Sequence, residues 1–177
     1  VVRYPAQFLL VLSMNPCPCG YYGSDAACRC APGQVQRYRG RLSGPLLDRI
    51  DLHVNVPRQT YREWAAEAKS EPSAAIAARV RRAWAIQEER FRGTGVSCNA
   101  EMTPALLRRH CTLGREAAAL LRRAFDALGL SARAHDRILK VARTIADLAG
   151  SEKVETEHIA EAIQYRMLDR PGEGMLG

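Results

Sequence analysis

Up to Pro57, short apolar runs alternate with loops rich in cysteine, glycine and arginine. The unbroken run Phe8–Leu12 is typical of a central strand in a parallel sheet, which is covered on both faces. Ile50–Val56 alternates apolar and polar residues with period two, as a half-buried strand does. The pattern predicts strands at Gln7–Met14 and Ile50–Val56. Because two strands do not make a stable sheet alone, we expect the remaining strands to lie elsewhere in a longer protein.

From Tyr61 onward, the apolar residues recur with the spacing of amphipathic helices. The stripes comprise Ile76, Val80, Ala83, Trp84 and Phe91; Ala117, Leu120, Leu121, Ala124 and Leu128; Ile138, Val141, Ala142, Ile145 and Leu148; and Ile159, Ala162, Ile163 and Met167. Gly93, Gly95, Gly129 and Gly150 follow three of these stripes, and glycine readily ends a helix. This part of the chain therefore predicts a small helical bundle.

Helix starts are marked by capping residues. Thr103 can cap a helix whose first residue is Pro104, a position that favours proline. Ser131 and Thr156 open two later helices. The fold expected is thus the C-terminal, α/β portion of a larger core in residues 1–58, with an all-helical domain in residues 59–170. Residues 171–177 are expected to be a frayed tail.

Composition and charge limit the class of protein, its location and its partners. Hydrophobic residues make up 47% of the 177 residues and charged residues 25%, which is typical of soluble globular proteins. No apolar run approaches the ~20 residues needed to cross a bilayer, and no signal sequence is evident, so we expect a cytoplasmic protein without a membrane partner. The net charge of +7 is carried mainly by arginine. Arginine binds phosphates in a bidentate manner, which suits an anionic partner, but it also serves general solubility.

Two closely spaced cysteine pairs follow the first predicted strand. They are Cys17, Cys19, Cys28 and Cys30. Four thiolates this close suit a tetrahedral, structural zinc site without an open position for water. The gap within each pair is shorter than in common zinc motifs, so unliganded thiols and disulfides remain alternatives, although a cytoplasmic protein keeps its thiols reduced. Cys98 and Cys111 are expected to be packing residues.

Aromatic residues and arginines are interleaved in and after the cysteine loop. They are Tyr21, Tyr22, Arg29, Arg37, Tyr38, Arg39 and Arg41. Such a set can stack on bases and bind phosphates, as in single-stranded nucleic-acid binding. The tyrosines can equally serve to cover the loop's own metal site.

Asn15 and Arg49 are candidates for contact with a nucleotide. Asn15 directly follows the first predicted strand, and ligands of parallel sheets lie at the carboxyl ends of strands. Asn-Pro is also a common turn dipeptide. Arg49 lies between Asp48 and Asp51, where it can form a local ion pair or reach the phosphate of a neighbouring subunit.

Arg133 is the third candidate. It lies two residues after the cap Ser131, with Arg137 one turn further on. Cations in the first turn oppose the helix dipole, which is reasonable if an anion binds at this helix start. Pairing with Asp136 is the structural alternative.

Some strings in the chain resemble those of the ComM/YifB magnesium-chelatase-like proteins. The matching strings are Tyr4–Ala6, Met14–Gly20, Tyr38–Arg39, Leu42–Leu52, Leu130–Ala134 and Arg143–Leu148. The resemblance implies an AAA+ ATPase that uses ATP and Mg²⁺ and forms homo-oligomeric, hexameric rings on DNA. Members of this type are similar to helicases that drive branch migration in natural transformation and competence.

The resemblance also implies residue roles. Asn15 would be the sensor-1 residue and Arg49 the arginine finger, both catalytic, while Arg133 would be the sensor-2 arginine of the helical lid; Asn15 and Arg133 would contact the nucleotide. The chain has no Gly-Lys-Ser/Thr phosphate loop and no strand ending in Asp-Glu for magnesium. We therefore expect the intact protein to hydrolyse ATP and this chain alone to be inactive.

Two other functions remain open. One is a magnesium-chelatase subunit that drives metal insertion into tetrapyrroles. The other is a non-enzymatic zinc module that binds nucleic acid. The cysteine pairs and the basic loop favour action on DNA over metal insertion, and a phosphate loop encoded upstream would argue against the non-enzymatic module.

Overall fold

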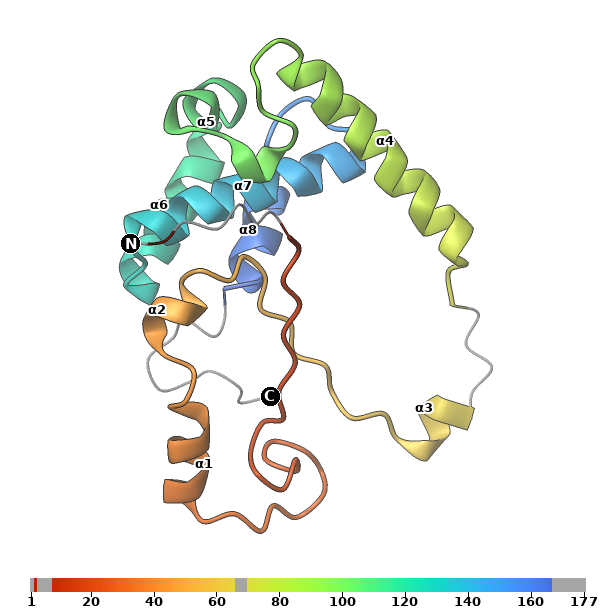
Figure 1. Ribbon diagram of the computed structural model, residues 1–177, viewed down its shortest axis with the longest axis vertical. Coiled ribbons are helices and arrows are strands. Elements are labelled where there is room, and N and C mark those ends of the chain that lie inside the picture. The colour runs from red at the N-terminus through yellow and green to blue at the C-terminus, as the bar shows by residue number, and fades with distance from the viewer. Residues whose placement is uncertain (1, 3–7, 66–69, 167–177) are drawn as a thin grey trace. The chain divides into compact units, whose positions relative to one another are not determined.

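The computed structural model describes residues 2, 8–65 and 70–166 (Figure 1). The chain divides into two compact units, one ending at Leu42 and one beginning at Ser43. Regular structure in the described residues is helical, apart from one isolated bridge between Leu113 and Val154. None of the described helices has the length and apolar character that a bilayer crossing requires.

The first unit contains the cysteine loop and α1 (Pro32–Arg39). Proline suits the first turn of α1 because its missing N–H has no partner there. The Gln34 side chain accepts a hydrogen bond from the backbone N–H of Ala31 at 3.0 Å, which closes the start of the helix. Val35 is the buried residue of α1 and anchors it to its unit.

The two predicted strands do not form sheet structure among the described residues. Residues 8–14 have no regular secondary structure and exposed apolar side chains, and Leu9 is 89% exposed; Gln7 lies outside the described residues. In Ile50–Val56 the side chains of Leu52, Val54 and Val56 are exposed as well. A strand is stabilised by hydrogen bonds to neighbouring strands, and the described residues offer none. The α/β portion of the expected fold is therefore not confirmed.

The second unit is a helical bundle. It consists of α2 (Gly44–Leu47), α3 (Tyr61–Ala65), α4 (Ser73–Phe91), η1 (Asn99–Glu101), α5 (Pro104–His110), α6 (Arg115–Leu128), α7 (Ala132–Ala149) and α8 (Thr156–Gln164). Helix α7 is central: it packs against α4, η1, α5 and α8, while α6 packs against α8 (Figure 1). Residues 43–58 share this compact unit with the bundle.

The helices predicted after Tyr61 are present among the described residues, and several of their predicted ends are confirmed. Met167 of the last predicted stripe and the predicted tail, residues 171–177, lie outside the described residues. Thr103 and Ser131 cap α5 and α7 through their hydroxyl groups, and Glu155, one residue before Thr156, is the cap position of α8. Gly129 and Gly150 end α6 and α7 with φ of 59° and 72°, a conformation that favours glycine.

The apolar stripes of α6, α7 and α8 meet in one core. It includes Ala117, Leu121, Ala134, Ile138, Ala142, Ile159 and Ala162. The stripe of α4 differs from expectation, because only Ala83 and Phe91 are buried. Ile76, Val80 and Trp84 of the same stripe are exposed.

A buried polar cluster joins three elements of the bundle. The carboxylate of Asp147 accepts hydrogen bonds from Arg90 of α4, Asn99 of η1 and Arg143 of α7. Arg143 also donates to the carbonyl of Glu152 at 2.8 Å, so the cluster reaches the loop before α8. Buried charges are tolerated only when they are paired and hydrogen-bonded, and this cluster meets that condition.

Candidate functional site

The four predicted zinc ligands come together in the first unit. The sulfur atoms of Cys17, Cys19, Cys28 and Cys30 all lie within 4.8 Å of one another. The Cys17 sulfur is 3.4 Å from that of Cys19 and 3.7 Å from that of Cys28. Four sulfurs around zinc at about 2.3 Å lie about 3.8 Å apart, whereas a disulfide needs about 2.0 Å. All four cysteines are free, so the geometry suits a tetrahedral metal site.

The backbone of the loop prepares the cysteines for this role. Gly20 and Gly23 adopt positive φ, and the N–H of Gly20 donates to the Cys17 carbonyl at 3.0 Å, which turns the chain back on itself. Backbone hydrogen bonds from Tyr21 and Arg29 lower the pKa of Cys19 to about 6. The thiolate is the form that binds metal, so the lowered pKa of Cys19 favours metal binding, whereas burial and the neighbouring thiols raise the pKa of Cys30.

Two of the tyrosines near the loop carry arginines on their rings. The guanidinium of Arg39 lies 5.9 Å from the ring centre of Tyr22, and that of Arg41 lies 5.8 Å from the ring centre of Tyr38. These distances are typical of cation–π contacts. Tyr21, Arg29 and Arg37 are also exposed. Together with the two arginine–tyrosine pairs, they offer both flat aromatic surfaces and positive charge.

Asn15 lies beside the cysteine loop. Its side chain is exposed, and its amide atoms are 3.9 Å from where a side chain at Gly20 would begin. Asn15 belongs to the first unit, whereas Arg49 and Arg133 belong to the second.

Arg133 is held by Asp48, not by Asp136 as the sequence suggested. Its NH1 donates to Asp48 Oδ2 at 3.1 Å, across 85 positions of the chain. The hydroxyl of Ser131 donates to Asp48 Oδ1 at 2.9 Å. Asp136 instead accepts from the ring of His135 at 3.2 Å.

Burial alone would raise the pKa of Asp48. The hydrogen bonds from Ser131 and Arg133, together with the positive charges of Arg133 and Arg166, outweigh it and leave this pKa lowered. Asp48 is therefore a carboxylate at neutral pH.

Arg49 is oriented differently from its neighbours. It is exposed, and its NH1 donates to the Pro45 carbonyl at 2.8 Å. Within residues 8–65 and 70–166, Arg49 forms no ion pair, so the alternative of a local pair with Asp48 or Asp51 is not seen. Asp51 pairs with Arg137 of α7.

The segment that carries Arg49, residues 43–53, is fastened to the bundle at further points; we call it the finger segment. Arg166 is 1% exposed, and its NH1 donates to the Ile50 carbonyl. The N–H of His53 donates to the Tyr165 carbonyl at 2.8 Å, and its buried ring lies 3.2 Å from the Leu47 carbonyl. Sequence patterns did not indicate these partners, because all but the last join positions far apart in the chain.

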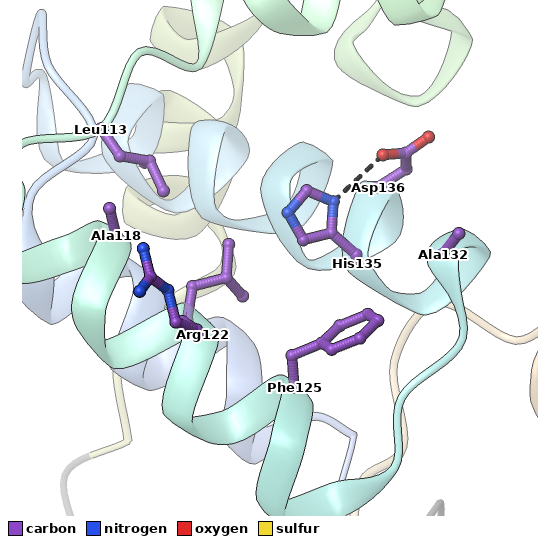
Figure 2. A pocket seen from close by; sticks show the side chains of 8 residues that line it. Leu113, Ala118, Arg122, Phe125, Ala132, His135 and Asp136 are labelled. Atoms are coloured by element: carbon purple, nitrogen blue, oxygen red, sulfur yellow. Dashed lines mark hydrogen bonds and ion pairs between the residues drawn. The ribbon is translucent and has the colours of Figure 1, made fainter.

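A hollow of about 460 Å³ lies beside the start of α7. Figure 2 shows its lining, in which the rings of Phe125 and His135 stand nearly perpendicular with centres 6.2 Å apart. Arg122 and the His135–Asp136 pair are its polar groups. Asp136 thus contacts His135, whereas Arg133 pairs with Asp48.

Comparison with known proteins places the chain in a family. Residues 70–166 match the family described as magnesium chelatase, subunit ChlI C-terminal, and residues 1–64 match magnesium chelatase, subunit ChlI. Competence protein ComM of Haemophilus influenzae is 41% identical over 170 residues, which cover 96% of this chain and 32% of ComM. YifB of Escherichia coli is 41% identical over 170 residues, covering 96% of this chain and 33% of YifB.

A protein of Mycobacterium bovis is 41% identical over 166 residues, covering 94% of this chain and 33% of that protein. The chain thus spans about a third of the length of these relatives. The matches to both halves, together with these relatives, show that the chain belongs to the ComM/YifB-type, magnesium-chelatase-like family.

Proposed function

We propose that this chain supplies the arginine finger, the sensor residues and the lid of an ATP-dependent motor that acts on DNA. The observation that supports it best is the arrangement around Arg49. Asp48 and Asp51, on either side, are paired with lid arginines, while Arg49 itself is exposed and forms no ion pair among the described residues. A finger must present its charge outward to a neighbouring subunit, and the exposure of Arg49 supports this role.

Three residues act on the nucleotide, each in a different role. Arg49 stabilises the charge that develops on the phosphoryl group in the neighbouring subunit's site. Arg133 contacts the terminal phosphate of its own subunit, and Asn15 orients the attacking water. The phosphate loop and the magnesium ligands belong to other parts of the intact protein, in which residues 7–14 and 50–56 act as strands of the shared sheet.

Zinc and DNA complete the proposal. Zinc held by the four cysteines folds the loop of the first unit, which has little core of its own. The arginine–tyrosine pairs beside it bind the nucleic-acid strand. The name of the competence protein ComM is consistent with action on DNA. The family description favours magnesium insertion into tetrapyrroles as the second candidate.

Mixing experiments on the intact protein test the finger. Arg49→Ala should lower ATP turnover by about 10³-fold or more, whereas Arg81→Ala, an exposed arginine of α4, should have no effect. Mixing the Arg49→Ala protein with a phosphate-loop variant should restore turnover, because some interfaces then pair an intact finger with an intact site. Arg133→Ala should not be rescued in this way. Full turnover by Arg49→Ala would contradict the proposal.

The choice between DNA and tetrapyrrole is tested separately. Single-stranded DNA should stimulate turnover by the intact protein, and Arg39→Ala with Arg41→Ala should weaken this stimulation. Stimulation by a porphyrin, with no response to DNA, would favour the second candidate.

A further inference from the structure

We infer that Asp48 is a positioning residue that links the nucleotide bound by one subunit to the finger that this subunit offers its neighbour. The inference rests on the proposed roles of Arg49 and Arg133. It concerns a residue with no assigned role in that proposal, and it follows from what the Asp48 carboxylate contacts.

Both oxygens of Asp48 are engaged by the bundle. Oδ2 accepts from Arg133 at 3.1 Å, and Oδ1 accepts from Ser131 at 2.9 Å. Arg166 lies 3.7 Å from Oδ1 and is almost fully buried, so it is a fixed positive charge beside the carboxylate. The Asp48 side chain is itself only 23% exposed.

Arg133 can exchange its contact with Asp48 for a contact with a bound phosphate. The Arg133 side chain is 57% exposed and uses NH1 for Asp48, so it is accessible to an incoming phosphate. A terminal phosphate bound to Arg133 would lie beside the Asp48 carboxylate, and like charges at such distances repel strongly when they are partly removed from water. The phosphate and Asp48 therefore compete for Arg133.

Loss of Arg133 leaves Asp48 with Arg166 as its nearest remaining cation. The carboxylate would move toward Arg166, while the Asp51–Arg137 pair holds the other side of Arg49 in place. Arg49 directly follows Asp48, and both of its contacts, from its side chain to the Pro45 carbonyl and from its N–H to the Leu46 carbonyl at 2.9 Å, are to the short helix α2. A shift of Asp48 therefore reorients the turn that carries Arg49. Nucleotide binding in one site is thereby sensed at the next.

The competition gives Asp48→Asn two distinctive effects in the intact protein. Removal of the charge frees Arg133, so the Kd for a non-hydrolysable ATP analogue should fall, by a factor of about 5 or more if the coupling is of ordinary size. The Hill coefficient of ATP turnover should fall toward 1, because the finger no longer responds to the lid. Asp48→Glu keeps the charge and should retain cooperativity.

Matched variants separate this role from a purely structural one. Asp126→Asn removes an exposed carboxylate of α6 and should change neither the Kd nor the Hill coefficient. In an Arg133→Ala background, Asp48→Asn should no longer affect the Kd, because the guanidinium for which Asp48 and the phosphate compete is absent. Circular dichroism on each variant confirms folding, and Asp48→Glu provides a second test if Asp48→Asn is poorly folded.

The outcomes distinguish the inference from the function on which it rests. If Asp48→Asn lowers the melting temperature but leaves the Kd and the Hill coefficient unchanged, the inference is overturned while Arg49 keeps its role. If Arg49→Ala retains full turnover in the same assay, the proposed function fails, and the inference fails with it.

Discussion

Arg90 and Asp147 lie 57 positions apart and form a two-pronged ion pair, with NH1 to Oδ2 at 2.6 Å and NH2 to Oδ1 at 2.5 Å. The Asp147 side chain is fully buried, and Arg90 is 12% exposed. Since Asn99 and Arg143 donate to the same carboxylate, one residue holds α4, η1 and α7 together. The pair is therefore central to the stability of the bundle.

Asp147→Ala should destabilise the chain by about 3–5 kcal/mol, because it leaves two buried arginines without their counter-charge. Urea denaturation followed by circular dichroism measures the free energy of unfolding. The matched control is Glu71→Ala. Its partner Arg79 makes a similar two-pronged contact, at 2.8 and 3.1 Å, but both side chains are more than 40% exposed, so the cost should stay below about 1 kcal/mol. Equal costs for the two variants would contradict the assignment.

The chain should carry one zinc ion, held by the cysteine cluster of the first unit. Elemental analysis after purification without chelators measures it. Cys17→Ser should abolish zinc binding, because Cys17 is the fully buried member of the cluster, whereas Cys98→Ser should leave the zinc content unchanged. A folded, metal-free chain would show that the four thiols only pack together.

Cys111 should influence stability at alkaline pH. Burial raises the pKa of its thiol to about 11, above the ordinary value near 8.5. A raised folded-state pKa means that the neutral thiol stabilises the fold below about pH 8.5 and that this contribution is lost as pH rises toward 11. The difference in unfolding free energy between the chain and Cys111→Ala should narrow from pH 8 to pH 10.5. A constant difference would show that ionisation of Cys111 does not affect folding.

The bundle should fold without the first unit, and the finger segment should stabilise it. A piece starting at Tyr61 should show a cooperative helical melt, since its core residues all follow that position. A piece starting at Ser43 should melt at a higher temperature, because it adds the contacts of Asp48, Asp51 and His53. Equal melting temperatures would show that these contacts do not contribute.

The difference in melting temperature between the two pieces should depend on pH. The pKa of Asp48 is lowered in the folded chain, so its contribution is present above the ordinary carboxyl value near 4 and is lost as pH falls below it. Melting curves of both pieces between pH 7 and pH 3 measure this, and the gap should shrink only below about pH 4. In the Asp48→Asn variant the part of the gap that depends on pH should be smaller.

Helix ends were predictable because they depend on adjacent residues. Ser131 and Thr103 cap helices with their own hydroxyls, and Gly129 ends a helix by adopting a positive φ. The cysteine cluster was predictable for the same reason, since its members lie within a short loop whose glycines turn the chain.

Partners far apart in the chain were not predictable. The pairing of Arg133 with Asp48 depends on how the finger segment lies on α7, and Asp136 was the nearer carboxylate by sequence alone. The predicted strands are not seen among the described residues, because strand pairing depends on other strands. One long-range feature does have a local signal: Arg143 and Asp147 lie four positions apart on a stripe that is otherwise apolar, which is the pattern of a buried ion pair.

The run Phe8–Leu12 has a practical consequence for work with the isolated chain. It has no regular secondary structure, its side chains are exposed, and it includes no charge or proline. Segments of this kind pair readily with identical segments of other molecules and so seed aggregation. Solubility of the isolated chain will therefore depend on protein concentration, and a lysine in place of Leu9 would act as a gatekeeper that raises the usable concentration.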